Sequence, residues 1–289
     1  MSSPDVAPNP APAGQSAFQA FESKNIVSGS TDFLESNSWI AKLAFLLLVI
    51  IGFVLLFRLA VTLLSSIFAP SGKSILINGL LNGNTQTIVS QDPGIKSSKT
   101  IIRSINEKPG IEFTWSTWLF LNGFDNSNKY HHVFNKGNIS FDTQGIVTPN
   151  NAPGIYLSPG YQGLRVVLNT FERPDAEIID INDLPMNKWF NVMVRVQDKF
   201  CDVYINGRLT KRRIMNAVVK QNYDNVNVAM NGGFNGYISN LTYFNSAIGI
   251  AEIQNIITAG PNLKPMDNNL ATAKPRYLAE RWFFDQNAV

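Results

Sequence analysis

An uninterrupted apolar run near the start of the chain constrains the fold more than any other feature. Residues 43–57, LAFLLLVIIGFVLLF, contain no polar side chain and lie between Lys42 and Arg58. Each Leu, Ile, Val or Phe in it favours bilayer insertion by ~0.3–0.6 kcal/mol, so the run contributes roughly −5 kcal/mol. A helix that is apolar on every side offers no polar face to water, which disfavours the alternative of a buried core helix. The sequence therefore predicts one transmembrane helix within residues 39–68.

The position of this helix in a bilayer has two solutions, because a span needs about 20 residues. The span either begins at Trp39 and ends at Arg58, or continues to Phe68 with Arg58 inside. The first is favoured, because Trp suits an interface and the Lys42 stem can reach outward to water. The run lies too far from the N-terminus for an ordinary cleaved signal peptide, so we expect a permanent single-pass membrane anchor. Two basic residues lie close to each end of the run, so its orientation stays open.

Charge and cysteine content exclude several classes of function. The formal net charge of +3 is too small to indicate a nucleic-acid partner. Cys201 is the single cysteine, so no intramolecular disulfide can form, and an oxidising compartment is disfavoured. The chain has two histidines, His131 and His132, which nearly exclude a His-based metal or catalytic site. Glycosylation sequons at Asn138 and Asn240 carry little weight in a chain so rich in Asn.

Composition divides the chain into four segments. Residues 1–38 are rich in Pro, Ala, Ser and Gly and should be disordered. The transmembrane region at 39–68 follows, and a β domain occupies residues 69–260. The tail at 261–289 is irregular, with room for an amphipathic helical turn or two at residues 276–284, which can dock on the β domain or on a partner.

Short runs of Ile, Val, Thr and aromatic residues, separated by Asn-Gly and Pro-Gly turns, predict the β domain. The clearest period-two alternation lies at 188–197 and 201–206, which we expect to form a hairpin followed by a turn at Asn206. Val194 and Cys201 fall on the buried face, with the cysteine acting as a small apolar side chain. Arg195 falls on the opposite face, and Arg195→Ala should cost well under ~1 kcal/mol if that face is solvated. If it is covered, residues 276–284 are the candidate cover.

One helix and one bulge are also predicted. Isoleucines between Gly249 and Ala259 share one helical face, Gly260 suits a C-cap, and Pro261 prevents continuation. In residues 234–241 the apolar positions 234, 238 and 241 break the alternation, which requires a bulge, and glycine at 236 allows close backbone approach.

The order of motifs in the β domain resembles the laminin G-like or concanavalin A-like lectin and glucanase family. The matching stretches are FTWSTWLF at 113–120, FNKG at 134–137, MNKWFNV at 186–192, DVYINGRL at 202–209 and FNGYISNLTYF at 234–244. The resemblance implies an antiparallel jelly-roll β-sandwich, so the expected fold class is mainly β after one transmembrane α-helix. The whole architecture is also similar to lectin-like membrane proteins of large DNA viruses.

Some members of that family are glycosidases, which need paired carboxylates on one strand face. The nearest stretch here contains Glu172, Asp175 and Glu177, and its spacing fits neither family pattern. Five residues separate the two glutamates, so they point to opposite sides of a regular strand. We therefore expect no enzyme activity and assign no catalytic residue.

Calcium binds at the sandwich rim in many family members, and this chain has four aspartates near predicted turns: Asp125, Asp142, Asp198 and Asp224. A turn aspartate more often caps its own backbone, so no metal or other cofactor is assigned. His131 and His132 alternate faces of a strand and cannot bind one metal together. Residues 211–213, KRR, should form a solvated turn, the alternative being contact with an acidic partner or lipid headgroups.

The function expected first is a non-enzymatic, membrane-anchored structural or interaction protein, such as a virion membrane or minor capsid-associated component. The alternative is a membrane-tethered, glycan-binding adhesion module, and a glycoside hydrolase is less favoured. The expected partners are the lipid bilayer, proteins of a larger assembly and a glycan, without nucleic acid. The ligand-binding residues stay unknown at this level.

Overall fold

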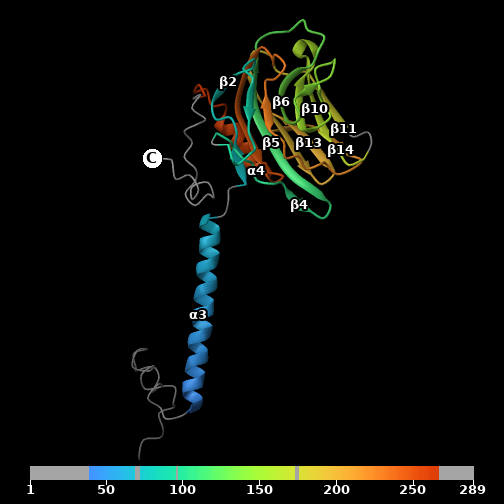
Figure 1. Cartoon of the computed structure of the whole chain (residues 1–289). Coiled ribbons are helices and arrows are strands. Elements are labelled where there is room, and N and C mark those ends of the chain that lie inside the picture. The colour runs from blue at the N-terminus through green and yellow to red at the C-terminus, as the bar shows by residue number, and fades with distance from the viewer. Residues whose placement is uncertain (1–38, 69–71, 96, 173–175, 267–289) are drawn as a thin grey trace, which may run out of the picture. The chain divides into compact units, whose positions relative to one another are not determined.

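The computed structural model describes residues 39–68, 72–95, 97–172 and 176–266. The chain divides into two compact units, Met1–Pro70 and Ser71–Val289, each of which is described by itself (Figure 1). The predicted disorder at 1–38 and the predicted turns at 276–284 lie outside the described residues.

The first unit contains helix α3 (Trp39–Phe68), a single helix of 30 residues. At 1.5 Å per residue it is roughly 45 Å long, and the stretch Lys42–Ile67 is long and apolar enough to cross a membrane. Leu48, Phe53 and Leu56 are each about two-thirds exposed. The long apolar helix predicted from the sequence is confirmed. It continues past Arg58 without a break, so it includes both placements of the span.

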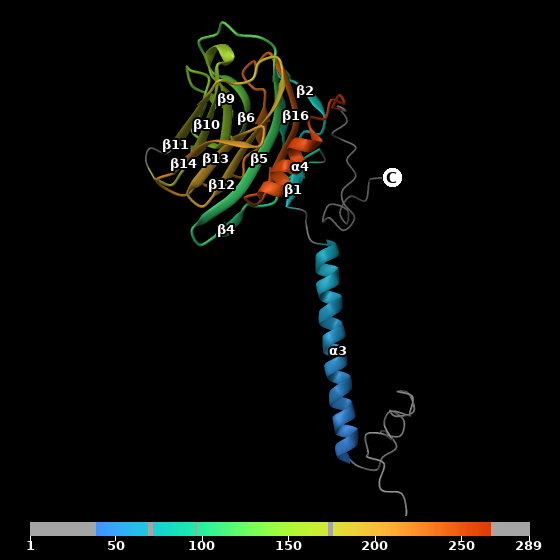
Figure 2. The same ribbon diagram turned by 180° about the vertical axis from the view of Figure 1, so that it is seen from behind.

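The second unit consists of two antiparallel sheets and a short hairpin (Figures 1 and 2). The larger sheet has the order β1 (Lys73–Ile75), β16 (Gly236–Phe244), β5 (Gly110–Leu121), β12 (Trp189–Gln197), β13 (Phe200–Ile205) and β14 (Arg208–Ile214), with β2 (Leu80–Asn82) beside β16 and β4 (Ile105–Glu107) beside β5. The smaller has the order β11 (Ala176–Asn182), β10 (Gly163–Asn169), β9 (Asn151–Leu157), β6 (His131–Gly137), β15 (Val226–Val228) and β3 (Thr87–Val89). The separate hairpin joins β7 (Ser140–Phe141) to β8 (Val147–Thr148), and a short 3₁₀ turn, η1 (Pro159–Tyr161), precedes β10. The predicted fold class, a mainly β antiparallel sandwich preceded by a long apolar helix, is confirmed.

The core lies between the two sheets and is filled by the inward side chains of both. The ring centroid of Trp115, in the larger sheet, lies 5.3 Å from that of Phe134 in the smaller sheet. It lies 5.0 Å from the ring centroid of Tyr243. Val194 pairs with Val203 in the β12–β13 register, and both are fully buried. Burying such aromatic and branched side chains removes large apolar areas from water, which is the main force that holds the sheets together.

The predicted hairpin and its turns are confirmed. Gln197 of β12 pairs with Phe200 of β13, so Asp198 and Lys199 form a two-residue turn. Asn206 and Gly207 adopt φ angles of 50° and 74° and connect β13 to β14, as the Asn-Gly pair predicts.

The predicted bulge also exists. The pairing of β16 with β5 shifts between Ser239 and Thr242, and Asn240 within the shift has a φ of 52°. A Cβ on Gly236 would lie 2.0 Å from the carbonyl oxygen of Phe120, so only glycine permits this approach of β16 to β5.

Helix α4 (Ile250–Ala259) covers part of the outer face of the larger sheet (Figure 2). It begins after Gly249 and ends at Gly260, whose N–H donates to the carbonyl oxygen of Ile256. Ile253 is buried against Met193 and Phe244, whereas Ile250 is 76% exposed and does not join that contact. The helix therefore lies where predicted, although its first isoleucine faces water.

Arg195 lies on the face opposite to Val194, as predicted, and of the two alternatives for that face the structure shows the covered one. Its guanidinium donates to the carbonyl oxygen of Ile248 at 3.1 Å and to the fully buried carboxylate of Asp202 at 3.2 Å. The outer face carries a second, smaller apolar cluster beneath α4, so both faces of these central strands are covered. Among the described residues the cover is α4, and the segment at 276–284 lies outside them.

The basic run at 211–213 is also corrected, because it lies in edge strand β14 and not in a turn. Arg212 binds Asp202 through two hydrogen bonds of 2.6 and 2.8 Å. Arg213 binds the buried carboxylate of Glu177 on β11 at 3.1 Å. The run therefore neutralises buried acids along the edge where the two sheets approach each other.

Candidate functional site

The four aspartates considered for calcium lie in separate turns and do not converge. Asp142 accepts the backbone N–H groups of Gln144 and Ile146 at 2.9 and 2.8 Å. Asp125 accepts the N–H of Ser127 in the same way. These are local caps of the kind that turn aspartates usually make. In the part of the chain that the structure describes, no three Asp, Glu, His or Cys side chains are grouped as metal ligands would be.

The carboxylates considered for glycoside hydrolysis do not form a pair. Glu172 is exposed in a bend, whereas Glu177 is buried on β11. Both oxygens of Glu177 are engaged, one by Arg213 and the other by the backbone N–H of Asn216. Asp175 lies outside the described residues.

The two histidines lie in different surroundings. Nδ1 of His131 lies 2.9 Å from the carbonyl oxygen of Gly233. His132 is fully buried: its Nε2 lies 2.9 Å from Oδ1 of Asn135, and its Nδ1 accepts the N–H of Met230. Burial lowers the pKa of His132 to about 4, so the ring is neutral at pH 7.

The outer face of the smaller sheet is polar but closed. Asn135 and Asn227 are hydrogen-bonded there, and the hydroxyl of Tyr156 donates to Asn151. The β7–β8 hairpin packs its apolar side chains over this face, and the Phe141 ring contacts His132 at 5.4 Å between centroids. These polar groups are buried, and most of them are hydrogen-bonded to one another, although Oδ1 of Asn227 has no partner.

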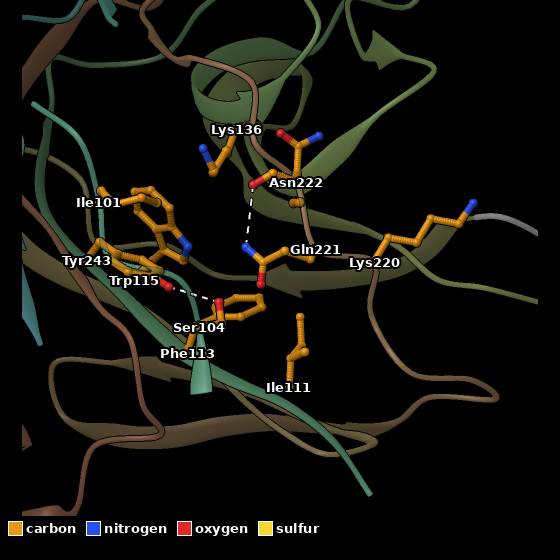
Figure 3. A pocket seen from close by; sticks show the side chains of 11 residues that line it. Ile101, Ser104, Ile111, Phe113, Trp115, Lys136, Lys220, Gln221, Asn222 and Tyr243 are labelled. Atoms are coloured by element: carbon orange, nitrogen blue, oxygen red, sulfur yellow. Dashed lines mark hydrogen bonds between the residues drawn. The ribbon is translucent and has the colours of Figure 1, made fainter. Parts of the chain in front are cut away.

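A pocket opens at the edge of the core between the two sheets (Figure 3). Its aromatic wall is formed by Phe113 and Trp115 of β5 and Tyr243 of β16. Lys136 of β6 lies opposite, from the other sheet. The remaining lining comes from the start of β5, from the segment before β4, from β9 and from the segment before β15: Ile111, Ile101, Ser104, Ala152, Lys220, Gln221 and Asn222.

Lys136 is the buried cation of this pocket and is 4% exposed. Its ammonium donates to the backbone carbonyl oxygen of Asp224 at 2.6 Å. Burial lowers the pKa of Lys136 to about 8, and the nearby charge of Asp224 opposes part of that change. The side chain is therefore mainly charged at pH 7, and one hydrogen bond occupies one of its three N–H groups.

One further polar group of the pocket lacks a partner. Oε1 of Gln221 is buried without a hydrogen bond, while its Nε2 is 3.5 Å from the carbonyl oxygen of Asn222. An unpaired acceptor is costly inside a protein, so its presence beside a cavity is compatible with a ligand group or a water there.

Sequence reasoning missed this pocket. Phe113, Trp115 and Lys136 lie in stretches that resemble the lectin-like family, but those motifs describe strands and turns and not a ligand site. The lining residues come from segments separated by more than a hundred positions, so no local pattern connects Lys136 with Tyr243.

Comparison with known proteins shows partial likeness to toxin domains. No model of a known protein family matches the chain. No curated protein matches it either. Among solved structures, it is similar to the binding domain of Paraclostridial Mosquitocidal Protein 1, with 19% identity, a TM-score of 0.43, and coverage of 65% of this chain and 46% of that one.

Two botulinum neurotoxin structures show the same level of likeness. The binding domain of serotype G has 10% identity and a TM-score of 0.43, over 65% of this chain and 46% of that one. The binding domain of neurotoxin DC in complex with SialylT has 13% identity and a TM-score of 0.44, over 65% of this chain and 45% of that one. This chain thus spans less than half the length of these domains, and with TM-scores below 0.5 the likeness carries no argument about ligands.

Proposed function

We propose that this protein is a membrane-tethered, non-catalytic binding module whose ligand is a glycan, bound at the pocket between the two sheets. The observation that supports the proposal is the pocket itself. It combines an aromatic wall, a buried ammonium and one unpaired buried acceptor in one opening. Aromatic surfaces with a few well-placed polar groups are typical of small-molecule sites.

The tether is supported by α3, whose apolar side chains are exposed around the whole helix. An exposed surface of that size is stable only when lipid or protein covers it. The stretch Lys42–Ile67 has the length and the composition of a membrane span.

The proposal that the module is non-catalytic is supported by the positions and hydrogen bonds of Glu172 and Glu177. Retaining and inverting glycosidases need two free carboxyl groups on either side of the bond that is cleaved. In the described part of the chain, Glu177 is committed to Arg213, and Glu172 is not its neighbour on a common face. The role of a virion structural component remains a prediction, since no described feature is specific to it.

A glycan array probed with the full-length protein in lipid nanodiscs tests the proposal. Wild type should retain a discrete set of glycans. Lys136→Met should lose most of that signal, because it removes the buried ammonium at nearly constant volume. Lys188→Met changes an exposed lysine outside the pocket and should bind like wild type. An empty array, or equal binding by Lys136→Met, would contradict the proposal.

A further inference from the structure

Strand β14 forms one edge of the larger sheet and is exposed along its whole length. It is the last strand in the order of the sheet and pairs with β13, so in the described part of the chain no strand pairs with its other side. All seven of its residues are exposed. In a strand that is bonded on one side, the N–H and C=O groups of alternate residues point to the open side and can accept another strand.

The contacts between β14 and β11 leave this open side without a backbone partner. Both views place the two strands beside each other at one margin of the sandwich (Figures 1 and 2). Lys211 and Arg213 lie opposite buried residues of β13 in the register, so they face inward. Nζ of Lys211 donates to the carbonyl oxygen of Asp180 at 2.9 Å, and Arg213 donates to the carboxylate of Glu177. No backbone hydrogen bond joins the two strands among the described residues.

The outer face of β14 adds apolar side chains to this edge. Ile214 pairs with Phe200 of β13, and Leu209 pairs with Tyr204, which packs against the apolar cluster beneath α4. Residues that pair directly share a face of the sheet, so all four lie on the outer face. Ile214 is 65% exposed, Leu209 47% and Phe200 41%. Helix α4 therefore does not cover this part of the face, which offers apolar contacts to a partner.

The charge of β14 limits which partner fits. Four of its seven residues are basic and none is acidic: Arg208, Lys211, Arg212 and Arg213. Glu177 binds Arg213, whereas Asp202 is shared by Arg212 and Arg195. The basic residues of the strand outnumber these two acids, so the edge keeps an excess of positive charge.

Three occupants of the edge can be compared. A second copy of β14 brings basic side chains next to one another, and like charges on neighbouring strands are destabilising. An anionic lipid surface matches the charge but supplies no row of alternating N–H and C=O groups for the open side of the strand. An extended peptide with acidic side chains supplies both.

We propose that β14 binds an extended acidic segment of a partner protein, which adds a strand to the larger sheet. In this complex the backbone of the segment bonds to the open side of β14. Its acids lie beside Arg208 and Lys211, and its apolar side chains lie beside Leu209 and Ile214. The positive charge that opposes self-association thus selects the partner. The site is separate from the pocket, whose lining contains no residue of β14, so it does not depend on a glycan.

The first test changes the ligand and leaves the protein intact. Phage-displayed random nonapeptides are selected on full-length protein in phosphatidylcholine nanodiscs, and the enriched sequences are synthesised. They should alternate Asp or Glu with Val, Ile or Leu. N-methylation at every second residue should weaken binding at least about tenfold in one register and by less than about twofold in the other, because alternate N–H groups of a strand point to opposite sides.

The second test changes the charge of the strand. Arg208→Glu combined with Lys211→Glu should weaken peptide binding at least about tenfold, because acids then meet acids. Lys129→Glu combined with Lys264→Glu changes two exposed lysines outside β14 and should bind like wild type. Equal melting temperatures of the two double variants show that folding is not the cause. If they differ, the N-methylated peptides and amide hydrogen exchange at residues 208–214 decide, since both use the wild-type protein.

Slower exchange at residues 208–214 when the peptide is added to wild type would support the added strand. Four results would overturn it: no enriched acidic sequence, equal loss of binding in both methylation registers, equal peptide binding by the two double variants, or unchanged exchange at residues 208–214. Slower exchange there without peptide, either after phosphatidylserine is added to the nanodiscs or at higher protein concentration, would also overturn it and assign the edge to lipid or to a second copy.

Discussion

Two buried carboxylates, Asp202 and Glu177, are the individual residues whose charges most need compensation. Asp202 is fully buried and receives hydrogen bonds from Arg195 on one side and Arg212 on the other. Glu177 receives its partner, Arg213, from the other sheet. A carboxylate at such a site costs several kcal/mol unless it is paired, so both acids depend on their arginine partners.

Arg195→Ala should lower the free energy of unfolding by about 2 kcal/mol, since Asp202 would then keep Arg212 alone. Arg208→Ala, an exposed arginine of β14, should cost less than about 0.5 kcal/mol. Urea unfolding of both variants measures the difference. Equal losses would show that the Arg195–Asp202 contact contributes nothing to stability.

His132 predicts a specific loss of stability in acid. Its pKa is about 4 in the folded protein against an ordinary 6.5, so the unfolded chain takes up a proton first as the pH falls. The stability contribution is complete above pH 6.5 and is lost between pH 6.5 and about 4, by on the order of 3 kcal/mol. In His132→Gln this component should be absent. Parallel stability profiles of the two proteins between these pH values would contradict the assignment.

At the scale of elements, α4 makes the larger sheet a layer that is covered on both faces. Ile253 is 2% exposed beneath the helix, whereas Ile250 is 76% exposed at its start. Comparing substitutions of these two isoleucines therefore tests the contact between α4 and the larger sheet directly.

Ile253→Ala should cost about 2–4 kcal/mol, because it opens a cavity against Met193 and Phe244. Ile250→Ala should change stability by less than about 0.5 kcal/mol. Thermal unfolding of the two variants measures this contrast, and a similar loss from both would mean that α4 is not docked as described.

What the sequence could predict at this scale depends on whether the signal is local. The β12–β13 hairpin, the bulge in β16 and the end of α4 follow from alternation and from Gly positions, and all three were found. Strand β14 was missed, because its arginines bind acids on other strands and its sequence lacks apolar alternation. The pocket was missed for the same reason, since its groups meet through the fold alone.

At the scale of the whole molecule, the chain contains a long apolar helix and a β-sandwich domain. We predict that the helix anchors the protein in a membrane. Replacing Leu48 and Val49 with Asp should then prevent insertion, because it adds roughly 5 kcal/mol or more to the free energy of insertion. Carbonate extraction of membranes should therefore release the Leu48→Asp/Val49→Asp variant and leave wild type in the pellet.

A matched control places the same two charges outside the helix. Leu209 and Ile214 are exposed apolar residues of β14, and changing both to Asp should leave the protein in the membrane pellet. Retention of the helix variant in the pellet would show that α3 is not the anchor.

The central claim is that the pocket between the sheets binds a glycan. The structure of the protein with the best-binding glycan of the array tests it most directly. We predict a saccharide at the mouth of this pocket, with one of its oxygens within hydrogen-bond distance of the Lys136 ammonium. A saccharide bound on another face of the sandwich, with water alone in this pocket, would contradict it.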